Sequence, residues 1–215
     1  GVFFMDFIKE PMAIENRSME LIAPHLAELH LDERETKLYS RLIHASGDVG
    51  YAPITRVHPQ AIDAAIAALK RGVDIYTDVE MVRTGINKKK LASFGGTVHC
   101  LVADPDVAAR AKAEGITRSM VAMRTFGKDM DGSIVAIGNA PTALFEVLRL
   151  VREEGIRPAC IVGIPVGFVG AAESKAELAA NDIVPYITVE GSKGGSPIAA
   201  AAVNALMYMI DNTRP

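Results

Sequence analysis

Cysteine and dense positive charge are both scarce in this chain of 215 residues, and each shortage excludes a class of protein. The two cysteines, Cys100 and Cys160, lie in separate apolar runs, which predicts reduced core residues in a cytoplasmic protein rather than a disulfide framework. Neither they nor the five histidines show zinc-binding spacing, so we expect no metal site. The net charge is −3, and the one dense basic run, residues 87–90, is more typical of a solvated helix face than of a nucleic-acid-binding arm.

Long apolar runs and several catalytic fingerprints are also missing. The most apolar segment, residues 197–210, is too short to span a bilayer and carries Asn204, so we expect no membrane segment. The first residues lack the apolar core and the cleavage site of a secretory signal. No GxSxG elbow or Walker loop occurs, and the glycines of residues 163–174 do not match GxGxxG, which argues against serine hydrolases and common nucleotide-binding enzymes.

Short apolar runs alternate with amphipathic segments along the whole chain. The apolar runs rich in Val and Ile predict strands at residues 73–79, 97–103, 133–138, 159–167 and 184–190. Because these runs are apolar almost throughout, we expect a mainly parallel sheet that is covered on both faces. Helical patterns lie at residues 59–71, 105–114, 140–154, 173–180 and 196–210, and two more, about 12–29 and 32–46, precede the first strand. The sequence predicts one three-layer α/β domain over residues 1–215, with a helical N-terminal addition.

Local signals fix several helix ends. Asp32 followed by Glu35 forms a capping box in front of the second helix. Asn139 as a cap and Pro141 in the first turn predict a helix that starts directly after a strand, and Gly155 predicts its end. This passage puts backbone N–H groups at the carboxyl end of a strand, where open α/β sheets usually bind ligands.

His44 is the first candidate for chemistry. Lys37, Arg41 and His44 recur at helical spacing on one face of the helix predicted at residues 32–46, so a basic stripe ends in an imidazole. A solvated face with a histidine favourably placed at a helix C-terminus explains the same pattern. The segment by itself leaves both interpretations open.

Other polar groups also fit either an anionic ligand or a structural role. Residues 191–195 form a glycine-rich turn before a helix with Ser196 as its cap, which would bind an anion through free N–H groups, although a bare turn fits equally well. A positive charge in the first turn of a helix is unfavourable with respect to the helix dipole. We therefore expect Arg118 either to bind an anionic ligand or to form a surface salt bridge. Asp78 and Glu80 follow a strand, where a structural cap is favoured over acid–base catalysis.

Seven segments in a fixed order carry a family resemblance. They are IENRSM, RLIHASGD, TDVEMV, ITRSMVAM, VAIGNAPTALFEVL, GIPVGFVGAAESK and GSKGGSPIAAAAVNAL. Together they resemble the precorrin-8X methylmutase family, including its cobalt-precorrin-8 counterparts, over residues 12–208. GNAPTAL and PVGFVGAAESK are the most distinctive of these stretches, whereas the glycine turn alone would mean little.

The resemblance implies an isomerase of cobalamin biosynthesis that moves a methyl group from C11 to C12 of precorrin-8X or cobalt-precorrin-8, giving hydrogenobyrinate or cobyrinate. It further implies a homodimer with a tetrapyrrole substrate and product, and chemistry that needs no cofactor. The family's histidine corresponds to His44, which would donate a proton to the macrocycle. The residues expected to bind the substrate are Ser18, Arg41, Arg118, Arg17, Lys193, Gly194 and Gly195.

Two departures from the family and two rival functions accompany this expectation. Where some relatives carry cysteine and tyrosine, this chain has Ser46 and Glu15, which leaves His44 in place but alters the predicted pocket. A non-catalytic tetrapyrrole carrier would keep the same arginines and glycine turns. Another α/β enzyme acting on an anionic ligand is the second rival, and the missing nucleotide fingerprints count against it.

Overall fold

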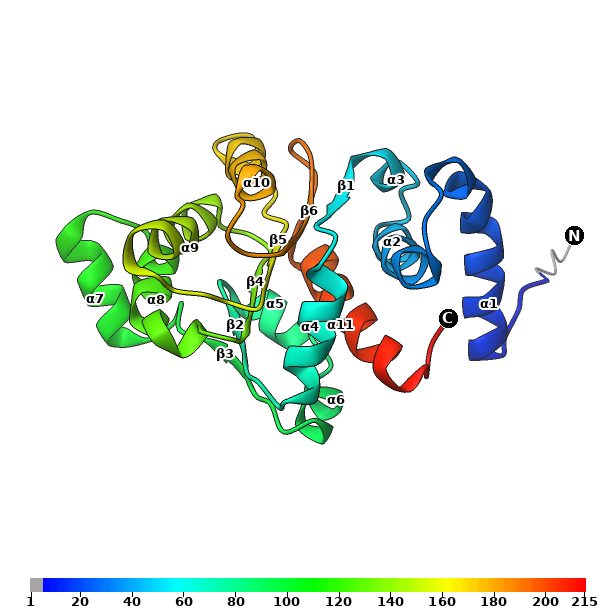
Figure 1. Cartoon of the computed structure of the whole chain (residues 1–215), viewed down its shortest axis with the longest axis horizontal. Coiled ribbons are helices and arrows are strands. Elements are labelled where there is room, and N and C mark those ends of the chain that lie inside the picture. Colours follow the sequence, from blue (N-terminus) through cyan, green and yellow to red (C-terminus); the bar gives the residue numbers. More distant parts are fainter. Residues whose placement is uncertain (1–5) are drawn as a thin grey trace, which may run out of the picture.

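The computed structural model describes residues 6–215, which form a six-stranded sheet between two layers of helices (Figure 1). The strands are β1 (Thr55–Val57), β2 (Ile75–Thr77), β3 (Val98–Cys100), β4 (Ile134–Ile137), β5 (Cys160–Gly163) and β6 (Tyr186–Val189), in the order β1-β6-β5-β4-β2-β3. Strands β2 to β6 run parallel, and β1 pairs antiparallel with β6 at one edge. The predicted α/β class and mainly parallel sheet are confirmed.

Helices cover both faces of the sheet. One face carries α2 (Glu33–Ser46), α3 (Tyr51–Ile54), α4 (Ala61–Lys70), α5 (Glu80–Gly85), α6 (Lys88–Ser93) and α11 (Ser196–Asp211), with α1 (Pro11–Ile22) packed outside α2. The other face carries α7 (Pro105–Glu114), α8 (Arg118–Phe126), α9 (Pro141–Glu154) and α10 (Ala171–Ala180). In Figure 1, α7 to α9 lie at one end of the molecule and α1 lies at the other. No helix within residues 6–215 combines the length and the apolarity that a bilayer crossing requires.

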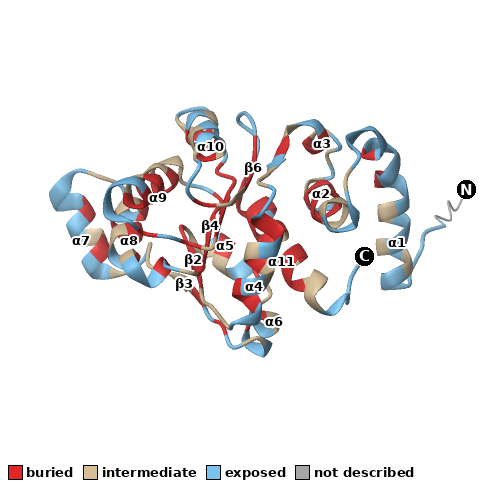
Figure 2. Ribbon diagram, viewed as in Figure 1, coloured by how far each residue is buried: buried red, intermediate tan, exposed pale blue. Residues whose placement is uncertain are grey.

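Alternate side chains of the central strands supply two separate cores. On β4, Ile134 and Ala136 join the core that includes α2, α4 and α11, whereas Val135 and Ile137 join the core of α7 to α10. All four side chains are fully buried, and the central strands are red in Figure 2. This two-sided burial explains why the strand sequences are continuously apolar instead of alternating.

The structure corrects some predicted elements. The helix expected at residues 12–29 ends at Ile22 and is followed by two 3₁₀ turns, η1 (Ala23–His25) and η2 (Ala27–Leu29). Pro24 lacks the N–H group that a continuing α-helix needs, which accounts for the break. The chain's first strand is β1 rather than the run at 73–79, because three residues at a sheet edge carry too little pattern to predict.

The helix-end predictions were partly right. The capping box is confirmed, since the Asp32 carboxylate accepts from the Glu35 N–H at 2.7 Å, and Gly155 ends α9 in the left-handed region at φ 70°. Asn139 and Ser196 are not caps, because the N-cap residues of α9 and α11 are Ala140 and Gly195. Neither N-cap makes a side-chain hydrogen bond to its helix, and the N–H groups of Ala143 and Ile198 donate to the N-cap carbonyls instead.

Gly138 provides the first test of this architecture, because it lies between the end of β4 and the start of α11. A Cβ atom on Gly138 would lie 2.7 Å from the Ser196 Cα and 2.6 Å from the Val82 Cγ2. We expect Gly138→Ala to reduce the free energy of unfolding by about 1–3 kcal/mol, the usual cost of overpacking a tight core. Urea denaturation of both proteins measures this difference, and a change below about 0.5 kcal/mol would show that α11 yields easily at this contact.

Candidate functional site

Several of the predicted site residues meet where the parallel strands end. β5 leads into the loop of residues 164–170, and β6 leads into the turn of residues 190–195. β1 is antiparallel to β6, with Thr55 opposite Val189, so the segment that joins α2 to β1 reaches the same edge. We call this place the carboxyl edge. Loops at such an edge are the usual ligand-binding part of an open α/β sheet.

His44 is exposed in the last turn of α2, and Gly47 ends that helix in the left-handed region at φ 66°. Ser46 shapes the following turn, because its hydroxyl donates to the Ile43 carbonyl at 3.1 Å and accepts from the Asp48 N–H at 3.1 Å. The His44 imidazole makes no hydrogen bond or ion pair with any residue in 6–215. The ring is therefore available to a ligand.

Lys193 lies beside this turn. Its Nζ contacts the Asp48 Oδ2 at 2.6 Å and lies 5.7 Å from the centre of the Tyr51 ring. The hydrogen bond between the two charged groups lowers the pKa of Asp48 and raises the pKa of Lys193. Since Asp48 is four residues after His44, the contact brings a cation from the end of β6 to the C-terminal end of α2.

The turn after β6 is closed against its neighbour rather than open to an anion. The Gly195 N–H donates to the Ile164 carbonyl at 2.9 Å, and both Gly195 and Ser196 are buried. A Cβ atom on Gly194 would lie 2.6 Å from that same carbonyl oxygen and 2.7 Å from the Pro165 oxygen. The glycines thus permit close backbone approach, which favours the interpretation as a bare turn.

Arg118 is exposed at the first position of α8. Thr117 caps this helix by accepting from the Met120 N–H at 3.2 Å, and its hydroxyl lies 2.9 Å from that of Thr142 on α9. Within the described chain, no carboxylate pairs with Arg118. The surface salt bridge that could have explained this cation is therefore absent from residues 6–215, and the guanidinium is available to an anion.

Asp78 follows β2 and holds the neighbouring strand end. Its fully buried carboxylate accepts from the N–H groups of Gly138, Asn139 and Ala140 at 3.0, 2.9 and 2.7 Å. Burial raises its pKa, although the three N–H donors act in the opposite direction. Glu80 pairs with Arg83 at 2.6 Å. The structural role expected for Asp78 is confirmed.

Arg41 lies one turn before His44 on α2, but its side chain is buried and already has partners. Its side chain is 10% exposed and contacts the Glu15 carboxylate at 3.3 Å, the Pro215 carbonyl at 2.9 Å and the face of the Tyr208 ring at 5.6 Å. Burial would raise the pKa of Glu15, but hydrogen bonds from Arg41 and Arg214 outweigh burial and lower it. The departure from tyrosine at position 15 therefore places a counter-ion on Arg41.

The two candidates on α1 also engage local partners. Arg17 pairs with Glu20 at 3.1 Å, and the Ser18 hydroxyl donates to the Ile14 carbonyl at 2.9 Å. Among residues 6–215, no hydrogen bond or ion pair links Arg17 or Ser18 to His44. The structure thus brings together His44, Lys193, Gly194 and Gly195. It places Arg118 at the start of α8, beside the end of β2, where the Ser119 hydroxyl donates to the Asp78 carbonyl at 3.5 Å. Ser18, Arg17 and Arg41 have their partners between α1, α2 and the C-terminal residues.

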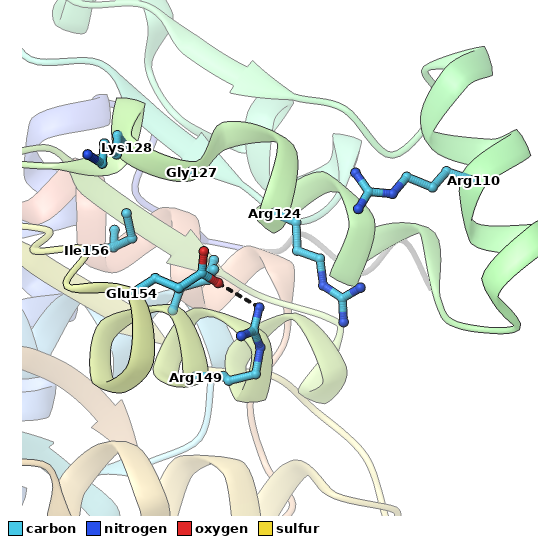
Figure 3. Close-up of a pocket in the computed structure, with 8 residues that line it drawn as sticks. Arg110, Arg124, Gly127, Lys128, Arg149, Glu154 and Ile156 are labelled. Atoms are coloured by element: carbon cyan, nitrogen blue, oxygen red, sulfur yellow. Dashed lines mark hydrogen bonds and ion pairs between the residues drawn. The ribbon is translucent and has the colours of Figure 1, made fainter.

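A second group of cations lies between α7, α8 and α9, near the opposite end of α8 from Arg118 (Figure 3). A cavity of about 410 Å³ there is lined by Arg110, Arg124, Lys128 and Arg149. The three guanidinium groups have carboxylate partners, notably Glu146, which is 2% exposed and contacts Arg124 at 2.8 Å and Arg149 at 2.6 Å. Their charges are already balanced, so this cavity is a weaker candidate than the carboxyl edge.

Lys175 on α10 was not among the predicted site residues. Its side chain is 1% exposed, and its ammonium group donates to the Lys193 carbonyl oxygen. Burial lowers the pKa of Lys175 to about 8. The signal that could have found it is its helical spacing from Ala171 and Leu178, which puts a lysine on the buried face of the helix.

Comparison with known proteins identifies the family of this chain. Residues 13–209 match the family model described as precorrin-8X methylmutase. The chain belongs to the precorrin-8X methylmutase family. A cobalt-precorrin-8 methylmutase from Priestia megaterium is 41% identical over 209 residues, which cover 97% of this chain and 92% of the relative. A precorrin-8X methylmutase from a Sinorhizobium species is 43% identical over 202 residues, which cover 94% of this chain and 96% of the relative.

A solved structure from the same family has the same fold. The precorrin-8X methylmutase of Thermus thermophilus superimposes with a TM-score of 0.85 at 37% identity, covering 94% of this chain and 98% of that chain. In the present member of the methylmutase family, RLIHASGD, GIPVGFVGAAESK and GSKGGSP converge on the carboxyl edge, whereas IENRSM lies on α1.

Residues 6–215 contain no group of three or more His, Cys, Asp or Glu side chains placed to hold a metal ion.

The buried ammonium of Lys175 predicts a pH-dependent difference in stability. Its pKa is about 8 in the folded chain against an ordinary 10.5, so the cost of burying the charge is complete below pH 8. That cost disappears as the pH rises to 10.5. We therefore expect the wild type to gain up to about 3 kcal/mol relative to Lys175→Met over this interval, at 1.36 kcal/mol per pH unit.

Urea denaturation at pH 7 and at pH 10 measures the difference. Glu177→Gln is the matched control, since Glu177 lies on the same helix but pairs with Arg152 at the surface. Its difference from the wild type should not change between pH 7 and pH 10. A Lys175→Met difference that is equally constant with pH would contradict the charged, buried state of Lys175.

Proposed function

We propose that the chain is a methylmutase of cobalamin biosynthesis that moves a methyl group from C11 to C12 of precorrin-8X or cobalt-precorrin-8. The product is hydrogenobyrinate or cobyrinate. The observation that carries this proposal is the family match over residues 13–209. Relatives named for the cobalt-free and the cobalt-containing substrate match to a similar degree, at 43% and 41% identity, which supports a corrin precursor of either kind.

His44 is the proposed catalytic residue. A methyl shift around a conjugated macrocycle requires electron reorganisation, and a proton on a ring nitrogen lowers the barrier to it. An exposed imidazole can donate that proton and recover it after the methyl group and its bonding electrons have moved. No electron is gained or lost, so this step calls for no redox cofactor.

Arg118 and Lys193 supply the proposed contacts to the substrate carboxylates. Both side chains are exposed, and a charge-assisted hydrogen bond to a carboxylate is stronger than a neutral one. Arg118 has no carboxylate partner within residues 6–215, whereas Lys193 would have to share its ammonium group between Asp48 and the substrate. The loop of residues 164–170, which is hydrogen-bonded to the turn that carries Lys193, adds an apolar surface, because Phe168 and Val169 are 95% and 91% exposed. This combination suits a large macrocycle with an apolar ring and an acidic fringe.

The remaining proposed substrate contacts are not free in this structure, because these residues already have partners within the chain. Arg41 would bind a substrate carboxylate only after that carboxylate displaces Glu15. Arg17 and Ser18 would contribute from α1, and Gly194 and Gly195 would contribute through the close-packed turn that holds Lys193.

We also propose that the chain is a homodimer with the macrocycle site near the subunit interface. α11 offers no support, because α2, α4 and α5 of the same chain cover it. The support comes from exposed apolar side chains on α1 and just before it: Phe7, Ile8, Met12, Ile14 and Leu21. Of these, Ile14 and Leu21 share one side of α1, and exposed apolar side chains that lie together are typical of a protein interface.

His44→Ala tests the catalytic assignment. We expect this variant to fold and to bind the tetrapyrrole, because His44 is exposed and makes no contact that the fold requires. Its turnover should fall about a hundredfold or more, the usual effect of removing a positioned acid–base group.

Single-turnover conversion of precorrin-8X, followed by its absorption spectrum across pH, measures both effects. Arg118→Ala is the contrasting variant, and its affinity should fall about ten- to hundredfold with a smaller change in the chemical step. A His44→Ala protein within tenfold of the wild type at every pH would remove His44 from the mechanism. A wild type that binds precorrin-8X without changing the chromophore would be a carrier.

Light scattering tests the proposed assembly. We expect a particle of about twice the 23.0 kDa chain mass at micromolar concentration. The variant Leu21→Glu introduces a charge on the exposed apolar side of α1 and should shift the protein toward the monomer. A wild type that is monomeric and fully active would refute the homodimer.

A further inference from the structure

Lys175 carries a buried positive charge that the packing of α10 does not require. It shares the buried face of α10 with Ala171 and Leu178, where methionine or leucine would fill the space without the cost of removing a charge from water. We propose that Lys175 is a positioning residue that holds the Lys193 carbonyl, and through it fixes the Lys193 cation at the carboxyl edge. The proposal rests on the proposed function, because it concerns how that site holds its substrate.

The contacts of the turn after β6 show what Lys175 adds. Two hydrogen bonds tie this turn to the loop of residues 164–170: Gly195 N–H to the Ile164 carbonyl at 2.9 Å, and Gly167 N–H to the Ser192 carbonyl at 3.0 Å. The third tie, from the Lys175 ammonium to the Lys193 carbonyl, reaches the turn from α10 instead. It lies between the other two along the turn and fixes the peptide that carries the Lys193 side chain.

The space between α10 and the end of β6 indicates why a long side chain is needed. A cavity of about 530 Å³ lies there, and its α10 wall is formed largely by alanines, including Ala172, Ala176 and Ala179. Gly191 and the end of β6 form the opposite wall. These alanines are too short to support the turn, so the lysine side chain makes the connection from the helix to the turn.

The position of the Lys193 backbone matters for the site because the side chain has specific partners. Its Nζ contacts the Asp48 carboxylate at 2.6 Å and the Tyr51 ring at 5.7 Å, on the turn that follows His44. A Cβ atom on Gly50 would lie 2.9 Å from that Nζ, so the ammonium fits closely against this turn. A backbone shift of about 1 Å at Lys193 would disturb both contacts and weaken a ligand bound there.

A double-mutant cycle tests whether Lys175 acts through Lys193. Hydrogenobyrinate binding is measured by absorption titration for the wild type, Lys175→Met, Lys193→Met and the double variant. We expect the dissociation constant to rise about tenfold in each single variant and no further in the double variant, because both remove the same positioned cation. Single-turnover rates at saturating precorrin-8X should stay within about twofold for Lys175→Met. Glu177→Gln, on the same helix, should match the wild type throughout.

Amide hydrogen exchange supplies a readout that needs no ligand. The Gly195 N–H, which donates to the Ile164 carbonyl, should exchange about tenfold faster in Lys175→Met because the turn opens more often. Lys175→Arg keeps a cationic donor and should restore slower exchange. If the wild type neither binds nor converts the tetrapyrrole, the proposed function fails, while the exchange result still decides the role of Lys175.

Three results would overturn the positioning role. The first is unchanged binding or unchanged Gly195 exchange in Lys175→Met. The second is an additive cycle, in which the double variant binds about a hundredfold more weakly than the wild type. The third is loss of the folded state in both Lys175→Met and Lys175→Leu, which would make Lys175 a residue of the core and not of the site.

Discussion

The carboxylate of Asp78 is the contact on which the arrangement of the carboxyl edge depends. It is fully buried at the end of β2 and accepts three consecutive N–H groups at the end of the adjacent strand β4. Those N–H groups belong to the residues that lead into α9, whose N-cap offers no side chain of its own. A buried carboxylate is costly unless it is hydrogen-bonded. Here the three donors satisfy it, and the turn before α9 is fixed in return.

The effect of this contact extends to the other side of the sheet. Gly138, the first of the three donors, packs directly against Ser196 at the start of α11. The residue before Ser196 is Gly195, whose N–H joins the turn after β6 to the loop after β5. The ends of β2, β4, β5 and β6 are therefore linked in one series of contacts, from the Asp78 carboxylate through Gly138 and Ser196 to Gly195. The exposed cations of this edge, Arg118 and Lys193, stand on a framework that is itself buried.

The features that could be predicted from the sequence are those set by local patterns of apolar and polar residues. The central strands were predictable because burial on both faces makes their sequences continuously apolar, and the capping box at Asp32 and Glu35 lies within a single turn. β1 was missed because three residues beside one neighbour carry little pattern. His44 was singled out by its place at the end of a basic helical stripe, and only the family resemblance favoured a catalytic role over a structural one; the side chain is exposed. The partners of Arg41 could not be predicted, because Glu15 and Pro215 come from distant parts of the chain. Lys175 was missed because its partner is a backbone carbonyl beyond the next strand.

The alternating side chains of β4 couple the two helical layers when the protein unfolds. Ile134 and Ala136 belong to one core, and Val135 and Ile137 belong to the other, so a single strand is a shared wall. Removing either helical layer would expose one side of that wall to water, which couples the two layers into one cooperative unit. α1 is different, because it packs outside α2 and leaves Met12, Ile14 and Leu21 exposed. Met19 and Ile22 hold the C-terminal end of α1 against the first core, so only the N-terminal turns of this helix can open locally without exposing that core.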